Sequence, residues 1–243
     1  MSKKVLIIAA DPAISTTTGW PVGFWASEVT HPYHVLIQAQ VQVTIASPKG
    51  GRLEMDAMSD PFHENGYSAW DEISKQYLQD KDFRASLENA PAISDLQWQD
   101  YDALIVAGGQ APMFTFEQEE ALQKLFVDFY ESGKVTAALC HGTAIFCFAR
   151  HPDGKLLAEN KQLTGFTNEE EDDADAAAAT RVMPWRIEDE LQMLGADFRK
   201  GEKWQPFVVE DGNLITGQQN MSGEAVALMV LKKLGLSKEK AKA

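Results

Sequence analysis

The chain has 243 residues, and its hydrophobic content of 44% and charged content of 24% are typical of a globular protein with a sizeable core. Its formal net charge of −14 disfavours nucleic acid and anionic membrane surfaces as partners. Two cysteines, Cys140 and Cys147, exclude a disulfide scaffold, and two helical turns between them are too many for a bridge. We therefore expect a protein of the reducing cytoplasm.

The first predicted elements are a buried strand, a helix and a second strand. Residues 5–10 are apolar, but this run is too short for a signal peptide or a membrane span, and we expect a core strand. The pattern of residues 25–40 predicts a helix, in which Pro32 either introduces a kink or begins a second helix. Residues 41–46 form the next predicted strand, which a glycine-containing turn ends.

The segment at about residues 51–95 is less regular and holds one predicted helix at about 68–87. We interpret it as a cap-like insertion over the active site, within a single domain that spans residues 1–243. Later strands are predicted at 101–107, 135–139 and 162–166, and later helices at 118–132, 143–149, 185–194 and 223–234. Asp211-Gly212 between two short apolar runs predicts a hairpin, and residues 237–243 predict a frayed charged tail.

Alternating helices and apolar strands predict an α/β fold, namely a doubly wound, mostly parallel sheet sandwiched by helices, of the flavodoxin-like type. Ligand sites in such sheets lie at the carboxyl ends of the strands. Asp11, Gly108-Gly109 and Cys140 all follow predicted strands, so we expect one site there. The acidic stretch at residues 169–175 is expected to be mostly a solvated loop that leads into a helix.

Cys140 stands between the predicted strand at 135–139 and the predicted helix at 143–149. A cysteine at such a junction would lie on a sharp turn, exposed at the top of the sheet, as in a nucleophile elbow. The helix N-terminus would favour the thiolate and lower the pKa of the thiol. We predict that Cys140 is an activated nucleophile, whereas Cys147, inside the apolar helix, is expected to belong to the core.

The segment Ala138-Leu139-Cys140-His141-Gly142 resembles the elbow A-x-C-H-G of the ThiJ/PfpI superfamily, which has the class I glutamine amidotransferase-like fold. Four more segments resemble the heat-shock-protein-31-like, or glyoxalase III, branch. In chain order these are a glutamate-bearing turn and helix at 19–32, T-G-F-[ST]-N-x-E-E at 163–171, V-P-x-x-x-E-D-E-L at 183–191 and G-Q-N-P-x-S at 217–222. Two positions depart from the pattern: Thr143 replaces a frequent proline, and Gln219-Asn220 replaces Asn-Pro.

The resemblance implies the roles of several side chains. Cys140 would be the nucleophile, and Glu28 would contact its sulfur. A carboxyl beside a thiolate tends to be protonated, and Glu28 could then shuttle a proton on the substrate carbon. His141 would be the base, oriented by a third acid. Alignment places that acid at Glu171 or Glu170, and we choose Glu171.

The turn after the strand at 101–107 would supply an oxyanion hole. The resemblance implies that backbone N–H groups serve there, which we assign first to Gly109 and second to Gln110. Glycine lets the backbone approach a substrate closely. No histidine–carboxylate cluster has metal spacing, and the glycine pair is too short for a phosphate loop, so we expect neither a metal nor a cofactor.

The activity that the resemblance implies is a cofactor-free, glutathione-independent glyoxalase that converts methylglyoxal to lactate, with deglycation as related chemistry. A small aldehyde would be its substrate, and a homodimer is one oligomeric state that the resemblance suggests. A stress chaperone or redox sensor, with reversible oxidation of Cys140, is the first alternative. An amidase or peptidase is the second. Glutamine amidotransferases take their base from a histidine far downstream of the cysteine, and here none follows His151.

Overall fold

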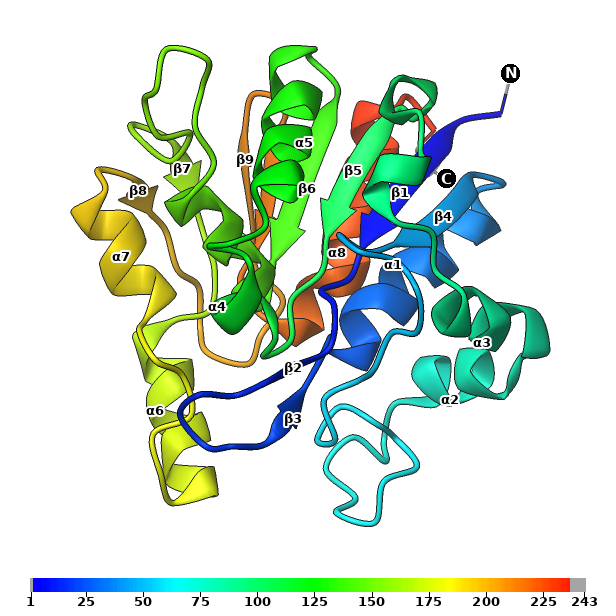
Figure 1. Ribbon diagram of the computed structural model, residues 1–243, viewed down its shortest axis with the longest axis vertical. Coiled ribbons are helices and arrows are strands. Elements are labelled where there is room, and N and C mark those ends of the chain that lie inside the picture. Colours follow the sequence, from blue (N-terminus) through cyan, green and yellow to red (C-terminus); the bar gives the residue numbers. More distant parts are fainter. Residues whose placement is uncertain (1, 237–243) are drawn as a thin grey trace, which may run out of the picture.

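The computed structural model describes residues 2–236 and has a central sheet between two layers of helices (Figure 1). Within these residues the sheet has six strands in the order β4-β1-β5-β6-β10-β9. All neighbours pair in parallel except β9 and β10, which form the predicted hairpin. The predicted α/β fold is therefore confirmed. The strands are β1 (Lys4–Ile8), β4 (Gln42–Ala46), β5 (Ala103–Val106), β6 (Val135–Leu139), β9 (Val208–Asp211) and β10 (Leu214–Gly217).

Apolar side chains on both faces of the central strands explain why the sheet is sandwiched. In β1, Leu6 and Ile8 belong to one core, whereas Val5 and Ile7 belong to the other, and all four side chains are fully buried. Successive residues of a strand point to opposite faces, so a continuous apolar run requires cover on both sides. Strands β5 and β6 follow the same pattern.

Two helices cover one face of the sheet, namely α1 (Ala26–Gln38) and α8 (Gly223–Lys233), which pack against each other. The other face is covered by α5 (Glu120–Glu131), the 3₁₀ helix η3 (Cys140–Cys147) and α7 (Ile187–Met193), with the short α4 (Pro112–Thr115) nearby. Pro32 lies inside α1, which continues through it. Cys147 is half-buried and packs against the core of this second face, and burial raises the pKa of its thiol to about 12.

Three predicted elements differ from the structure. The helix expected at 68–87 is two helices, α2 (Glu72–Gln79) and α3 (Lys81–Glu88), because Asp80 ends the first and caps the second through the Phe83 N–H. The segment after Cys140 is a 3₁₀ helix and not an α-helix. The strand expected at 162–166 is only β7 (Gln162–Leu163), which pairs with β8 (Asp197–Phe198) outside the main sheet.

The acidic stretch was expected to be mostly a loop, and this prediction was wrong. It forms α6 (Asn168–Ala178), which begins with a capping box between Thr167 and Glu170. Glu170 and Glu171 are buried, whereas Glu169 and Asp172 are exposed. The capped helix start turns two successive acids toward the protein and the acids on either side of them toward water, which a count of charges does not reveal.

The predicted insertion runs beside the lower end of the sheet in Figure 1, where the carboxyl ends of the strands lie. It begins with a bridge between Gly51 and Ala90, and its helix α2 packs against α1. Two short strands, β2 (Ala13–Ile14) and β3 (Pro21–Val22), pair at the same end. Within the described part of the chain, no helix is long and apolar enough to cross a membrane. The predicted charged tail lies outside the described residues.

Replacement of Glu170 by alanine should strongly lower stability. Its buried carboxylate accepts hydrogen bonds from the backbone of Thr167 (3.1 Å), the backbone of Trp204 (3.0 Å) and the Gln218 amide (3.0 Å). Loss of the carboxylate leaves these buried donors unpaired, and we expect Glu170→Ala to cost about 2–4 kcal/mol in the free energy of unfolding. The matched control is Glu169→Ala in the same turn, whose exposed ion pair with Lys200 should contribute about 0–1 kcal/mol. Urea unfolding curves measure both, and equal losses would contradict the expectation.

Candidate active site

Cys140 directly follows β6 and opens η3 with φ of 54°. A positive φ is uncommon for a residue other than glycine and marks backbone strain, which is frequent at functional sites. The hydroxyl of Thr143 donates to the Cys140 carbonyl at 2.6 Å and closes the turn. The side chain is only 2% exposed, so the expectation of an exposed cysteine was wrong: the sulfur lies at the floor of a cavity and not on the surface.

Two turns meet backbone to backbone around this elbow. A Cβ on Gly108 would lie 2.7 Å from the Gly142 nitrogen, 2.8 Å from the His141 nitrogen and 2.8 Å from a Glu28 oxygen. A Cβ on Gly142 would lie 2.7 Å from the Val106 carbonyl oxygen. Because these contacts are much shorter than any real Cβ makes, both positions require glycine for close approach.

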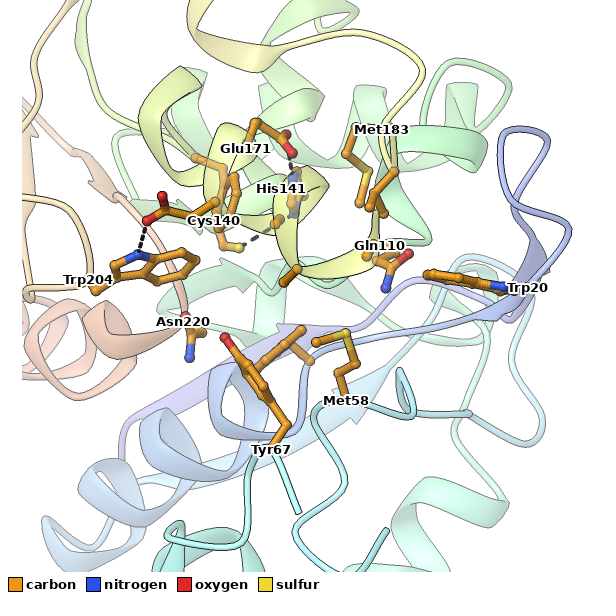
Figure 2. A pocket seen from close by; sticks show the side chains of 17 residues that line it. Trp20, Met58, Tyr67, Gln110, Cys140, His141, Glu171, Met183, Trp204 and Asn220 are labelled. Carbon is orange, nitrogen blue, oxygen red and sulfur yellow. Dashed lines mark hydrogen bonds and ion pairs between the residues drawn. The ribbon is translucent and has the colours of Figure 1, made fainter. Parts of the chain in front are cut away.

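His141 connects the cysteine to an acid. Its Nδ1 lies 3.6 Å from the Cys140 sulfur, and its Nε2 lies 2.9 Å from a Glu171 carboxylate oxygen (Figure 2). The Phe166 ring stacks on the imidazole with centroids 4.3 Å apart. The structure thus brings together the three predicted residues in the order nucleophile, base and orienting acid. Of the two candidate acids, Glu171 makes the contact, because Glu170 is used by the capping box.

Glu28 comes from the first turn of α1 and is fully buried. One carboxyl oxygen accepts the Gly108 N–H at 2.7 Å, and the other has no hydrogen-bond partner among the described residues. Burial raises the pKa of Glu28 to about 8, although the nearby Cys140 thiol and the hydrogen bond from the Gly108 N–H lower it. The carboxyl is therefore mostly protonated at neutral pH, with a proton to donate beside the sulfur.

The expected low pKa of the Cys140 thiol is not found. Burial raises the pKa of this thiol well above its ordinary value, and the charge of an ionised Glu28 raises it further, whereas the His141 N–H lowers it. The helix end that follows is a short 3₁₀ segment inside the protein, and its field does not offset burial. The nucleophile is a thiol before substrate binds. When Glu28 is protonated it carries no charge, and it then no longer adds to the rise in the pKa of the Cys140 thiol.

The turn after β5 leaves one amide free. The N–H groups of Ala107, Gly108, Gln110 and Ala111 donate to Ile8, Glu28, Asp56 and Gly23, respectively. Among the described residues, the Gly109 N–H donates to none, and Gly109 has φ of 104°. Gly109 itself is not among the residues that line the cavity, and its role as oxyanion donor stays a prediction. The expectation for Gln110 was wrong for its backbone, since Asp56 takes that N–H at 2.6 Å; only its side chain lines the cavity.

Asp56 is a site residue that the sequence did not reveal. It is fully buried, and its two oxygens accept the N–H groups of Gly23 (2.9 Å) and Gln110 (2.6 Å). Burial raises the pKa of Asp56 to about 7, while these hydrogen bonds and the nearby His141 lower it. This carboxyl ties the turn that precedes α1 to the turn after β5. It lies in the irregular segment, where no periodicity or motif distinguishes it.

The cavity above Cys140 has a volume of about 240 Å³. Trp20 and Trp25 line it. Figure 2 shows Trp204 and Tyr67 on one side of the cavity and Gln110 and Met183 on the other. The complete lining is Trp20, Trp25, Met58, Tyr67, Gln110, Cys140, His141, Phe166, Glu171, Asp173, Ala174, Ala177, Ala178, Val182, Met183, Trp204 and Asn220. In residues 2–236, no group of three or more histidines, cysteines and acids is arranged to hold a metal ion.

The raised pKa of Glu28 predicts a pH-dependent stability. Between its ordinary value of 4.5 and about 8, the folded protein holds a proton that the unfolded chain has released, so the stability due to Glu28 is lost as pH rises through this window. Glu28→Gln has no such proton. We expect the free energy of unfolding of the wild type, relative to Glu28→Gln, to fall by a few kcal/mol from pH 4.5 to 8, at about 1.4 kcal/mol for each unit of pKa. Asp56 is present in both proteins, so its own titration cancels in the difference between them. Denaturant curves at several pH values measure this difference in the free energy of unfolding, and a difference that stays constant between pH 4.5 and 8 would refute the raised pKa of Glu28.

Known proteins share this arrangement of elements over nearly the whole chain. Glyoxalase 3 of Candida albicans is 27% identical over 235 residues, which cover 93% of this chain and 96% of that protein. The crystal structure of glyoxalase III from Candida albicans matches with a TM-score of 0.78 at 26% identity and covers 95% of this chain and 96% of the other. The Rapid Encystment Protein 24 KDa of Francisella tularensis matches with a TM-score of 0.85 at 28% identity, covering 97% and 100%.

The family comparison agrees with the resemblance to the ThiJ/PfpI superfamily, which was based on the elbow and four further segments. The model of the DJ-1/PfpI family matches residues 21–233, which include Glu28, the turn after β5, the elbow and α6. The similarity to the glyoxalase III proteins agrees with the predicted branch of the superfamily. The chain belongs to the DJ-1/PfpI family.

Proposed function

We propose that the protein is a glutathione-independent glyoxalase that converts methylglyoxal to lactate. The observation that carries this proposal is a cysteine with a histidine–glutamate pair on one side and a buried, protonated carboxyl on the other. A thiol supplied by the protein replaces the thiol that glutathione would provide. The similarity to Candida albicans glyoxalase 3 supports the same reaction.

The first step is addition of the Cys140 sulfur to the aldehyde carbon of methylglyoxal. His141 takes the thiol proton, since its Nδ1 faces the sulfur while Glu171 holds Nε2. The carbonyl oxygen takes the proton of Glu28 and becomes the hydroxyl of a hemithioacetal, which leaves Glu28 as a carboxylate that can accept a proton in the next step. The free Gly109 N–H stabilises the negative charge that develops on this oxygen.

The next steps move protons between carbons. Removal of the proton from the former aldehyde carbon gives an enediol, and return of a proton to the neighbouring carbon gives a lactoyl thioester. Glu28 is placed to make these transfers, because it is buried beside the sulfur and its pKa lies near neutrality. Water then hydrolyses the thioester and restores the thiol. The sum is methylglyoxal plus water giving lactic acid, without net oxidation.

The rival functions have less support from the site. A redox sensor needs an accessible thiolate, but Cys140 is buried and its thiol pKa is raised. An amidotransferase needs a histidine downstream of the cysteine, and none follows His151. We include deglycation as related chemistry of the same nucleophile. We also propose that the protein is cytoplasmic and that it is a single domain in which residues 51–95 form a cap. Its oligomeric state is a monomer or a homodimer, and sedimentation would distinguish the two.

Incubation with methylglyoxal in the absence of glutathione tests the function directly. We expect lactate formation by the wild type, none by Cys140→Ala, and a loss of about 10²- to 10⁴-fold in kcat for Glu28→Gln, because the proton shuttle is removed. Cys147→Ala is the matched control and should keep full activity, since Cys147 does not line the cavity. A folded wild type with a titratable thiol and no turnover would overturn the proposal.

Replacement of Glu171 tests the orienting acid. Glu171→Gln should lower kcat by at least about tenfold with little change in KM, because an amide can no longer hold the imidazole in the form that accepts the thiol proton. Asp172→Asn, at the exposed neighbouring position, is the control and should behave like the wild type. Equal kinetics for the two variants would exclude this role for Glu171.

A further inference from the structure

The cavity above Cys140 is larger than methylglyoxal needs. A water molecule takes about 30 Å³ in the liquid, so the cavity of about 240 Å³ equals roughly eight waters. Methylglyoxal has three carbons and two oxygens, joined by bonds much shorter than the distance between waters. It would therefore leave about half of the space or more unfilled. A ligand that fits this cavity carries a larger group than a methyl next to its two carbonyl groups.

Most of the cavity wall is apolar and rich in aromatic rings. The amide, imidazole and carboxylate side chains of the lining are those of Gln110, Asn220, His141, Glu171 and Asp173, whereas the remaining wall is mostly aromatic, methionine or small aliphatic side chains. Aromatic rings prefer edge-to-face or offset contact with other rings, and methionine sulfur contacts ring edges favourably. The rings and sulfurs of this wall come from Trp20, Trp25, Met58, Tyr67, Phe166, Met183 and Trp204.

The charges of the cavity disfavour an anionic ligand. Among its lining residues there is no lysine or arginine. Its two acids already have partners: Glu171 is paired with His141, and Asp173 accepts from Lys203 at 2.8 Å and from the Trp204 indole at 2.8 Å. No positive group is left for a phosphate or a carboxylate, and burial of an unpaired anion there is costly. The ligand that matches this lining is neutral.

We propose that the preferred substrates are neutral 2-oxoaldehydes with an aryl or similarly large apolar substituent, of which phenylglyoxal is the simplest aryl member. This inference rests on the proposed glyoxalase function. The chemistry is unchanged: the sulfur adds to the aldehyde carbon, the proton shifts between the two carbons, and water releases the acid. Phenylglyoxal plus water gives mandelic acid. The phenyl ring lies against the aromatic wall and excludes the water that methylglyoxal leaves in place.

Initial rates with phenylglyoxal and methylglyoxal, without glutathione, test the inference through mandelate and lactate formation. We expect kcat/KM to be on the order of tenfold higher for phenylglyoxal, as burial of an aromatic ring would give. Because the two aldehydes differ in intrinsic reactivity, the decisive quantity is the ratio of their kcat/KM values in matched variants. 4-Carboxyphenylglyoxal, which places a negative charge on the same ring, should be turned over at least about tenfold less efficiently than phenylglyoxal.

Tyr67 and Trp70 provide the matched pair of variants. Both are exposed aromatics of the same loop, at 46% and 51%, so neither replacement should affect folding, but only Tyr67 lines the cavity. Tyr67→Ala should lower the phenylglyoxal-to-methylglyoxal ratio severalfold, and Trp70→Ala should leave it unchanged. Two results would overturn this inference and leave the proposed function intact. One is turnover of methylglyoxal with a phenylglyoxal-to-methylglyoxal ratio of kcat/KM below one, and the other is an equal change of this ratio in Tyr67→Ala and Trp70→Ala. Failure to turn over either aldehyde would overturn the proposed function itself.

Discussion

The site depends on the direct backbone contact between the turn after β5 and the turn after β6. Gly108 and Gly142 approach so closely that neither has room for a Cβ. This contact brings the Glu28 carboxyl to the Gly108 N–H and sets that oxygen beside the elbow backbone. In the parallel sheet, β5 and β6 are neighbours in register, and their turns therefore meet at one edge. Every reacting group is positioned relative to this contact.

Two buried carboxyl groups flank the elbow with pKa values near neutrality, and they differ in what they do. Within residues 2–236, one oxygen of Glu28 has no hydrogen-bond partner, and the carboxyl lies beside the sulfur, so its proton can move. Both oxygens of Asp56 are engaged by backbone N–H groups from two separate turns. Burial raises the pKa of both carboxyl groups. Glu28 is placed for proton transfer, whereas Asp56 holds two turns together. A thiol with a raised pKa is compatible with this site, because the proton is moved when substrate is present and not before.

Much of the fold and part of the site could be predicted from the sequence. Apolar strands that end in glycine pairs or in Cys140 identify the sheet and its functional edge, because burial and turn chemistry are local properties. The choice between Glu170 and Glu171 also had a local signal: Thr167 three positions before Glu170 forms a capping box, which leaves Glu171 to reach the histidine. Asp56, Met58 and Tyr67 had no such signal. They lie in irregular chain, and only the packing of that chain against distant turns brings Met58 and Tyr67 to the cavity and Asp56 to the backbone of the turn after β5. The pKa of Cys140 was predicted in the wrong direction because burial depends on the whole fold.

The hydrogen bonds that complete the site join positions far apart along the chain. Glu28 and Gly108 are 80 residues apart, Asp56 and Gln110 are 54 apart, and His141 and Glu171 are 30 apart. Contacts of such long sequence separation require loop closure, which costs conformational entropy that the contacts within a helix do not cost. The thiol–histidine–carboxyl set therefore exists only in the folded protein, and an unfolded chain carries Cys140 as an ordinary cysteine without its base and acid.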